Sequence, residues 1–135
     1  MSSIIIPTLR YNDAAAAIDW LCAAFGFERH LVVEGDHQAV LHAQLSLDNA
    51  MIMIGQARDE AFDRLQKTPL DLNGVNTQSA YIVVEDIAAH FARASSAGAD
   101  IVFPPEAQDY GGSLYCCRDF EGYLWNFGTY NPWRD

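Results

Sequence analysis

The sequence predicts an α+β fold built from two tandem βαβββ modules, and three observations support this prediction. First, each half of the chain shows a strand, a helix and three further strands in that order. Second, residues near the ends of these elements repeat at one offset, since Asp13 and Asp86 lie 73 positions apart, as do Gly55 and Gly128. Third, 135 residues suit one domain with one core, so we expect the modules to pack as a single domain over 1–135.

In the first module, predicted over 1–56, a β-like run at 3–11 is followed by a helix. Asn12 or Asp13 can cap this helix and Gly26 can end it. Apolar residues recur at helical spacing and should pack on a sheet, namely Ile18, Leu21, Cys22 and Phe25. Three short segments separated by turn signals then predict an antiparallel meander over 28–35, 38–47 and 50–55.

A polar stretch over 57–77, with Pro69 and Gly74, predicts a linker that contains one short helical turn. The second module, predicted over 78–135, repeats the order of the first. Its predicted elements are a strand over 79–84, a helix over 85–98 that ends at Gly98, and strands over 100–105, 113–119 and 123–130.

Eight basic and eighteen acidic residues give the chain a formal net charge of −10. This charge repels phosphate backbones and anionic membrane surfaces, so we expect no nucleic-acid or membrane partner, and cationic or neutral ligands are favoured. The segment MSSIIIPTLR has no basic start, and its apolar run of three residues is too short for a signal peptide or a membrane span. We therefore expect a cytoplasmic protein.

Three stretches carry a family resemblance: LRYNDAAAAIDWLCAAFGFE, HAQLSLDNAMIMIG and DYGGSLYCCRDFEGYLWNFGTY. In these stretches the chain resembles the vicinal oxygen chelate superfamily of glyoxalases, bleomycin resistance proteins and extradiol dioxygenases, and most closely its small bacterial resistance-type members. The resemblance covers nearly the whole chain. It implies a curved mixed sheet with a U-shaped cleft, helices on the outer face, and a ligand inside.

The resemblance also implies where a metal would bind. Metal enzymes of this family take His, Gln or Glu ligands from the first and last strands of each module, and these positions fall on Ile6, Met53, Ser79 and Asn126. An isoleucine, a thioether, a hydroxyl and an amide offer nothing that holds zinc, nickel, iron or manganese tightly. We therefore expect no metal and no other cofactor, and we expect the Asn126 amide to hydrogen-bond a ligand or a neighbour.

Strand alternation selects the other candidate residues. If Asn126 faces the cleft, Trp125 points towards the helices and belongs to the core, while Arg10 and Val83 share the cleft side. The predicted ligand-binding cleft is based on three features. Strand alternation selects its side chains, methionines provide an adaptable wall, and aromatic rings can stack on a ligand. Its residues are Ile6, Thr8, His42, Gln44, Met51, Met53, Ser79, Tyr81, Tyr115 and Asn126. A solvent-exposed strand face explains the polar alternation at His42 and Gln44 about as well, so this alternative stays open.

Three functions are compatible with this sequence. The first is a metal-free small-molecule binding protein that resembles bleomycin resistance proteins and sequesters a cationic or aromatic compound in the cleft. The second is a metal-dependent glyoxalase-like lyase or isomerase, or a dioxygenase, with ligands at non-standard positions such as His42. The third is an enzyme or sensor that uses the cleft without a metal. The resemblance also implies a homodimer in which each cleft takes residues from both subunits.

Overall fold

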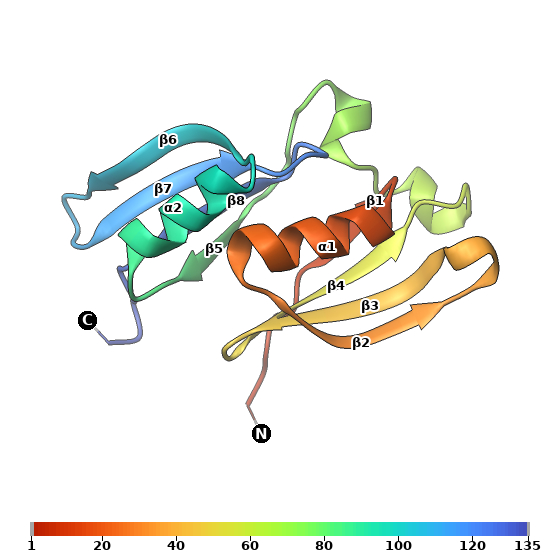
Figure 1. Ribbon diagram of the computed structural model, residues 1–135, viewed down its shortest axis with the longest axis horizontal. Helices are drawn as coiled ribbons and strands as arrows, with labels where there is room; N and C mark the ends of the chain where they lie inside the picture. Colours follow the sequence, from red (N-terminus) through yellow and green to blue (C-terminus); the bar gives the residue numbers. More distant parts are fainter. Residues whose placement is uncertain (1, 135) are drawn as a thin grey trace.

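The computed structural model describes residues 2–134, so residues 1 and 135, where the predicted domain begins and ends, lie outside the described range. Figure 1 shows the course of the chain. The first module consists of β1 (Thr8–Tyr11), α1 (Ala14–Phe25), β2 (Glu28–Glu34), β3 (Val40–Leu47) and β4 (Ala50–Gln56). The second consists of β5 (Ala80–Val83), α2 (Ile87–Ser96), β6 (Asp100–Ala107), β7 (Ser113–Arg118) and β8 (Leu124–Gly128). The α+β class and the repeated βαβββ order are thus confirmed.

The element boundaries differ from the prediction at the start of the chain and in the linker. The strand predicted over 3–11 begins only at Thr8, and Ile4 and Ile5 before it are exposed. The linker contains two short 3-10 helices, η2 (Ala61–Arg64) and η3 (Pro69–Leu72), where one helical turn is predicted. A third, η1 (Asp36–Gln38), lies in the turn between β2 and β3. Among residues 2–134, no helix is long and apolar enough to span a membrane.

Each module forms a mixed four-stranded sheet of its own. The strand order is β1-β4-β3-β2 in the first sheet and β5-β8-β7-β6 in the second, and the pairs β1–β4 and β5–β8 are parallel. The register repeats as well, because Thr8 pairs with Met53 while Tyr81 pairs with Asn126, each 73 positions further on. The sequence predicts one curved sheet, whereas the structure has two sheets of four strands each.

The two α-helices begin where the sequence provides caps. Asp13 accepts a hydrogen bond from the Ala16 backbone N–H at 3.1 Å, and Asp86 caps α2 in the same way. At the end of α1, Gly26 has a φ of 87° and donates its N–H to the Cys22 carbonyl at 3.2 Å. Glycine adopts this left-handed conformation without strain, so the chain turns directly into β2.

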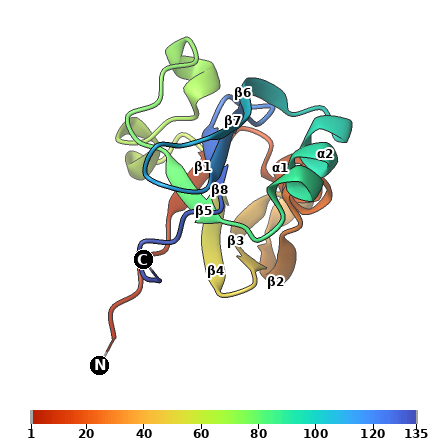
Figure 2. The same cartoon turned by 90° about the vertical axis from the view of Figure 1, so that its left-hand side faces the viewer.

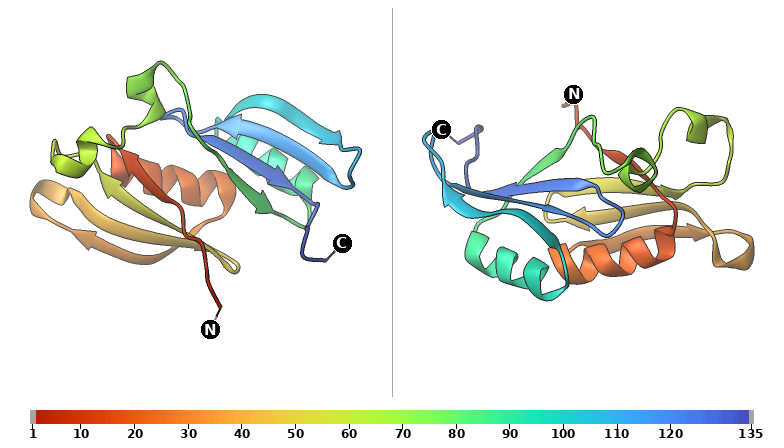
Figure 3. Two further views of the ribbon diagram at one scale, coloured as in Figure 1. Left: turned by 180° about the vertical axis from the view of Figure 1, so that it is seen from behind. Right: turned by 90° about the horizontal axis from the view of Figure 1, so that it is seen from above.

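Both α-helices cover the same side of the two sheets, as Figures 2 and 3 show. The core lies between these layers and includes Ile18, Leu21, Phe25, Leu45, Ile54, Trp125 and Phe127. The opposite side of the sheets faces the linker and both ends of the chain (Figure 2), and we call it the open face. Its side chains include Thr8, Arg10, His42, Gln44 and Met53 in the first sheet and Tyr81, Val83, Cys116 and Asn126 in the second.

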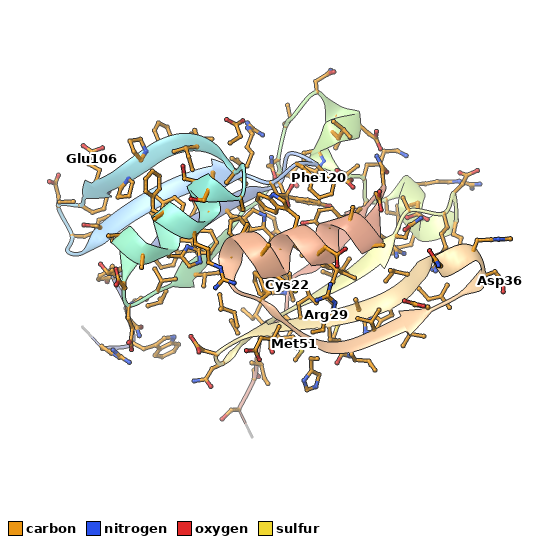
Figure 4. All side chains as sticks on the ribbon, viewed as in Figure 1. Cys22, Arg29, Asp36, Met51, Glu106 and Phe120 are labelled. Carbon is orange, nitrogen blue, oxygen red and sulfur yellow. The ribbon has the colours of Figure 1, made fainter. Side chains whose placement is uncertain are left out.

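The second module holds the start of α1. The carboxylate of Glu121, in the turn between β7 and β8, accepts the backbone N–H groups of Asn12 at 2.7 Å and Asp13 at 2.9 Å. Glu121 is only 2% exposed, and a carboxylate at a helix N-terminus is favourable. The neighbouring Phe120 (Figure 4) lies 6.3 Å from Trp20 of α1, measured between ring centroids.

The end of α1 is held by α2. Arg93 Nε donates to the Ala23 carbonyl oxygen at 2.8 Å. His90 Nε2 lies 3.0 Å from the Phe25 carbonyl oxygen, and His90 Nδ1 lies 2.6 Å from the Tyr115 hydroxyl. Because a carbonyl only accepts, Nε2 carries the ring proton and Nδ1 accepts from the hydroxyl. These contacts join the two modules through uncharged His90, whose pKa is lowered by burial.

Candidate ligand-binding site

Four of the predicted residues form a strip on the first sheet. Thr8 of β1 pairs with Met53 of β4, and Met53 pairs with Gln44 of β3. His42 lies two positions from Gln44 on the same face, and their Nε2 atoms are 3.1 Å apart. With the amide nitrogen donating, His42 Nε2 accepts and Nδ1 carries the ring hydrogen. The strip therefore offers a hydroxyl, an amide, an imidazole and one thioether.

A pocket of about 190 Å³ lies over this strip. Predicted residues Thr8, His42 and Met53 line it, together with Phe62 and Gln66 from the linker. The complete lining is Thr8, Leu9, Arg10, Leu41, His42, Met53, Ile54, Gly55, Phe62 and Gln66. Gln66 Nε2 donates to the Thr8 carbonyl oxygen at 3.0 Å, which ties the linker to β1 and closes one side of the pocket.

Among the lining residues, Arg10 supplies the positive charge. Its guanidinium carbon lies 4.9 Å from the centroid of the Phe62 ring, which is a cation–π contact. On the sheet, Arg10 pairs with Gly55, and a Cβ at Gly55 would overlap Arg10 Nη1. The guanidinium therefore contacts both an aromatic ring and bare backbone.

The linker carboxylate of Asp63 faces this guanidinium, with Oδ1 3.2 Å from Arg10 Nε. Asp63 Oδ2 accepts the backbone N–H groups of Arg58 at 3.1 Å and Glu60 at 3.0 Å. These two hydrogen bonds, assisted by the charges of Arg10 and Arg58, hold the pKa of Asp63 below its ordinary value. Asp63 thus fixes the linker turn and stays ionised beside Arg10.

In the second sheet, two predicted residues, Asn126 and Ser79, lie side by side. Asn126 Nδ2 donates to Ser79 Oγ at 2.9 Å and to the Ala80 carbonyl oxygen at 3.0 Å. Because a carbonyl only accepts, the amide nitrogen must face Ala80. The amide therefore ties the start of β5 to β8, and its Oδ1 is the group left to act as an acceptor.

Tyr81 covers a glycine as Arg10 does, although the residue that pairs with this glycine is Val83. The Tyr81 ring lies over Gly128, where a Cβ would overlap the hydroxyl, and that hydroxyl donates to the Tyr130 carbonyl oxygen at 2.7 Å. Gly55 and Gly128 are the equivalent positions noted in the sequence. Each module therefore has a glycine covered by a side chain from its own first strand.

The prediction that Tyr115 faces the cleft is wrong. Cys116 pairs with Asn126 and shares the open face, so Tyr115 points to the helix side, opposite Phe127. Tyr115 is 0% exposed and bonded to His90, and burial raises its pKa. It belongs to the core.

Gln44 of the strip does not line the pocket, and neither do two further candidates of the first module. Ile6 precedes β1 and is half-buried. Met51 pairs with Ser46 near the turn between β3 and β4, where Figure 4 labels it. A contact of either residue with a ligand therefore needs a ligand that extends beyond the pocket.

The residues at the metal positions of the family do not fit a metal. Ser79 and Asn126 meet, but they present a hydroxyl and an amide whose nitrogen is already bonded. Met53 offers a thioether, and Ile6 has no donor atom. Across residues 2–134, no group of three or more His, Cys, Asp and Glu residues has the arrangement of a metal site.

A larger hollow of about 560 Å³ lies beside η3 and the turn between β7 and β8. Its central charged groups are already engaged. Arg118 Nη1 donates to the carbonyl oxygens of Gly74 at 2.8 Å and Gly122 at 3.1 Å. Asp119 accepts from two buried aromatic side chains. We therefore place the candidate site at the smaller pocket, which has polar groups available to a ligand.

Sequence reasoning missed the contribution of the linker. Phe62 and Gln66 lie in the stretch 57–77, whose polar composition predicts an unpaired connection. One signal was available, because Phe62 is the single aromatic residue of that stretch and follows a turn-forming Asp-Glu pair. Its place over β1 depends on contacts across the chain, which no local pattern reports.

Two βαβββ modules, with both α-helices on one side of the sheets, define a paired-module α+β class of fold. The chain belongs to the Glyoxalase/Bleomycin resistance protein/Dioxygenase superfamily, whose family model matches residues 4–127. An uncharacterized protein of Mycobacterium bovis is 30% identical over 122 residues, covering 90% of this chain and 80% of that protein.

Two solved structures share the whole arrangement. TioX from Micromonospora sp. ML1 is 28% identical, with a TM-score of 0.74 over 96% of this chain and 100% of that chain. The bleomycin resistance determinant encoded on transposon Tn5 is 18% identical, with a TM-score of 0.67 over 95% of this chain and 98% of that chain. At this identity, the second likeness shows the fold alone.

Proposed function

We propose that the protein is a metal-free small-molecule binding protein that sequesters a cationic or aromatic compound on the open face. The observation that carries this proposal is the pocket between the first sheet and the linker. Aromatic, thioether and polar side chains and the guanidinium of Arg10 surround it, which suits an organic ligand better than a metal. Membership of a superfamily that includes bleomycin resistance proteins supports the same function.

Within this proposal, an aromatic ligand has the stronger support. The net charge of −10 attracts cations at long range, but the guanidinium of Arg10 repels a cation that enters the pocket. Phe62 is 48% exposed and offers a ring face or edge for stacking. Met53 supplies an adaptable wall.

We also propose that the protein is a homodimer. Apolar side chains remain exposed on the open face and at the edges of the sheets, among them Leu31, Val33, Tyr81, Val83 and Phe103. A second chain placed over them would bury apolar surface and protect the edge strands β2 and β6. Each site would then include residues of both subunits.

A thermal-shift screen of aromatic and cationic antibiotics tests the binding function. A ligand at 100 times its Kd stabilises the protein by about 2.7 kcal/mol, which such a screen detects. We expect Phe62→Ala to weaken binding of any hit and Leu65→Ala, a change of an exposed residue in the same linker turn, to leave it unchanged. Equal effects of both variants would place the ligand elsewhere.

The metal-free character needs a separate measurement. We expect elemental analysis of purified protein to find well below one equivalent of zinc, nickel, iron or manganese, and hits to bind equally with and without a chelator. We also expect mass spectrometry to recover the bound compound unchanged. About one equivalent of metal that is lost in His42→Ala, or a chemically altered compound, would favour an enzyme.

A further inference from the structure

The pocket contains strong donors that the protein itself leaves unused. Arg10 Nε lies beside Asp63 without hydrogen-bond geometry. Within residues 2–134, no hydrogen bond joins the two terminal guanidinium nitrogens to an acceptor, and Arg10 is one of the residues that line the pocket. A buried or half-buried guanidinium normally satisfies several of its five N–H groups. This one keeps a pair of parallel donors for a molecule that enters the pocket.

These donors are already held in place. The guanidinium contacts the Phe62 ring and lies against the Gly55 backbone, while Asp63 faces Nε. A fixed guanidinium loses little conformational freedom on binding, which increases affinity. Asp63 does not take up the terminal nitrogens, because its other oxygen accepts from the linker backbone.

We propose that Arg10 binds a carboxylate carried by the aromatic ligand, which makes aromatic carboxylic acids the ligand class. This inference rests on the proposed function and deepens it. The parallel N–H groups of a guanidinium match the two oxygens of a carboxylate, an arrangement that a lysine does not provide. Phe62 and Met53 then contact the ring, and the Thr8 hydroxyl lies in the same lining.

Size and charge agree with this assignment. The pocket, about 190 Å³, is smaller than the roughly 300–1,000 Å³ that holds a whole drug-sized ligand, so it suits one end of a molecule. The net charge of −10 opposes an anion at long range. That repulsion is screened beyond about 8 Å at physiological ionic strength, whereas the contact with Arg10 is not.

A matched pair of probes, 2-naphthoate and 2-naphthamide, tests the proposal by titration into ¹⁵N-labelled protein. We expect the amide signals of Met53 and Gly55 to shift, and 2-naphthoate to bind about tenfold or more tighter. Arg10→Met should abolish this preference, and Arg10→Lys should keep only part of it. Arg29→Met, the same charge change at the exposed pair with Asp19 on the helix side, should retain it.

Each other outcome overturns the proposal in a recognisable way. Equal binding of the two probes, or an unchanged preference in Arg10→Met, removes Arg10 from recognition while the aromatic site stands. A loss of preference in Arg29→Met shows a general charge effect. If neither probe binds, the aromatic site fails as well. If Arg10→Met unfolds and so loses its dispersed amide spectrum, the test depends on Arg10→Lys, which keeps the charge beside Asp63. An undiminished preference for 2-naphthoate in Arg10→Lys then overturns the proposal.

Discussion

The carboxylate of Asp119 organises the polar centre of the core. Oδ2 accepts from the Tyr11 hydroxyl at 2.6 Å and from Trp125 Nε1 at 3.0 Å, while Oδ1 accepts the backbone N–H groups of Glu121 and Tyr123 at 3.0 Å. Burial raises the pKa of Asp119, and these hydrogen bonds oppose that shift. The ring of Trp125 is thus fixed both by packing and by its N–H group.

We expect Trp125→Ala to lower the free energy of unfolding by about 3–5 kcal/mol, because it removes a ring that is 1% exposed and leaves Asp119 short of a donor. Chemical denaturation followed by circular dichroism measures this loss. Trp133→Ala is the control, since that ring is 94% exposed and should contribute almost nothing. Similar midpoints for Trp125→Ala and wild type would show that the ring is not a core element.

Alternation along β8 was sufficient to place Trp125 in the core and Asn126 on the open face, because large apolar and smaller residues alternate there. The same reasoning failed for Tyr115. In the run LYCC every residue is apolar or nearly so, and nothing in it marks which side faces solvent. Only the pairing of Cys116 with Asn126 decides the matter, and pairing between strands is not a local property.

Helix α1 is held at both ends by groups of the second module. Glu121 accepts the backbone N–H groups before its first turn, and Arg93 and His90 donate to carbonyls of its last turn. Both sets satisfy groups that a helix leaves unpaired. The junction of the two modules therefore contains a titratable ring, that of His90, which stacks on Phe25.

We expect His90→Gln to reduce the dependence of stability on pH. Burial lowers the folded pKa of His90 below its ordinary value of 6.5, so the folded state prefers the neutral ring. The stability that this ring contributes is complete above about pH 6.5 and is lost as the pH falls towards the folded pKa. Wild type should therefore lose more Tm than His90→Gln between about pH 7.5 and 5.5.

His30→Gln, at an exposed position of β2, is the matched control and should follow wild type across this range. Parallel Tm curves for wild type and His90→Gln would show that His90 does not link the junction to pH. Gln was chosen because its amide can donate to the Phe25 carbonyl and accept from the Tyr115 hydroxyl.

The cap candidates made α1 predictable, since Asp13 and Gly26 are local signals with a local effect. The 3-10 helices of the linker were only partly predictable. Thr68 caps η3 by accepting from the Leu70 N–H, but Thr68 also donates to the Glu121 carbonyl oxygen across the molecule. Such turns are set by what they pack against, which the linker sequence does not reveal.

For the whole molecule, we expect light scattering coupled to size exclusion to give about twice the chain mass of 15.0 kDa at micromolar concentration. Phe103→Glu, on the exposed edge strand β6, should shift the distribution towards single chains because it places a charge on an apolar surface. Leu65→Glu, on the exposed linker, is the control. A single chain mass for wild type would contradict the dimer.

The 73-residue repeat made the architecture of the whole molecule predictable. When the same order of elements occurs twice in a chain, few arrangements bury both sheets. The position of the pocket was not predictable. It forms where the linker returns to β1, with Gln66 bonded to Thr8 and Asp63 facing Arg10. These partners are more than fifty positions apart, so the pocket results from the folded chain rather than from any segment.

The two covered glycines, Gly55 beneath Arg10 and Gly128 beneath Tyr81, show how two modules of one fold can carry different chemistry. Both modules have the same vacant backbone position, and any long side chain from the first strand can lie across it. A cation in one module and a phenol in the other then require no change in the scaffold. A combinatorial library randomised at positions 10 and 81, with both glycines kept, would therefore vary the chemistry of each half independently.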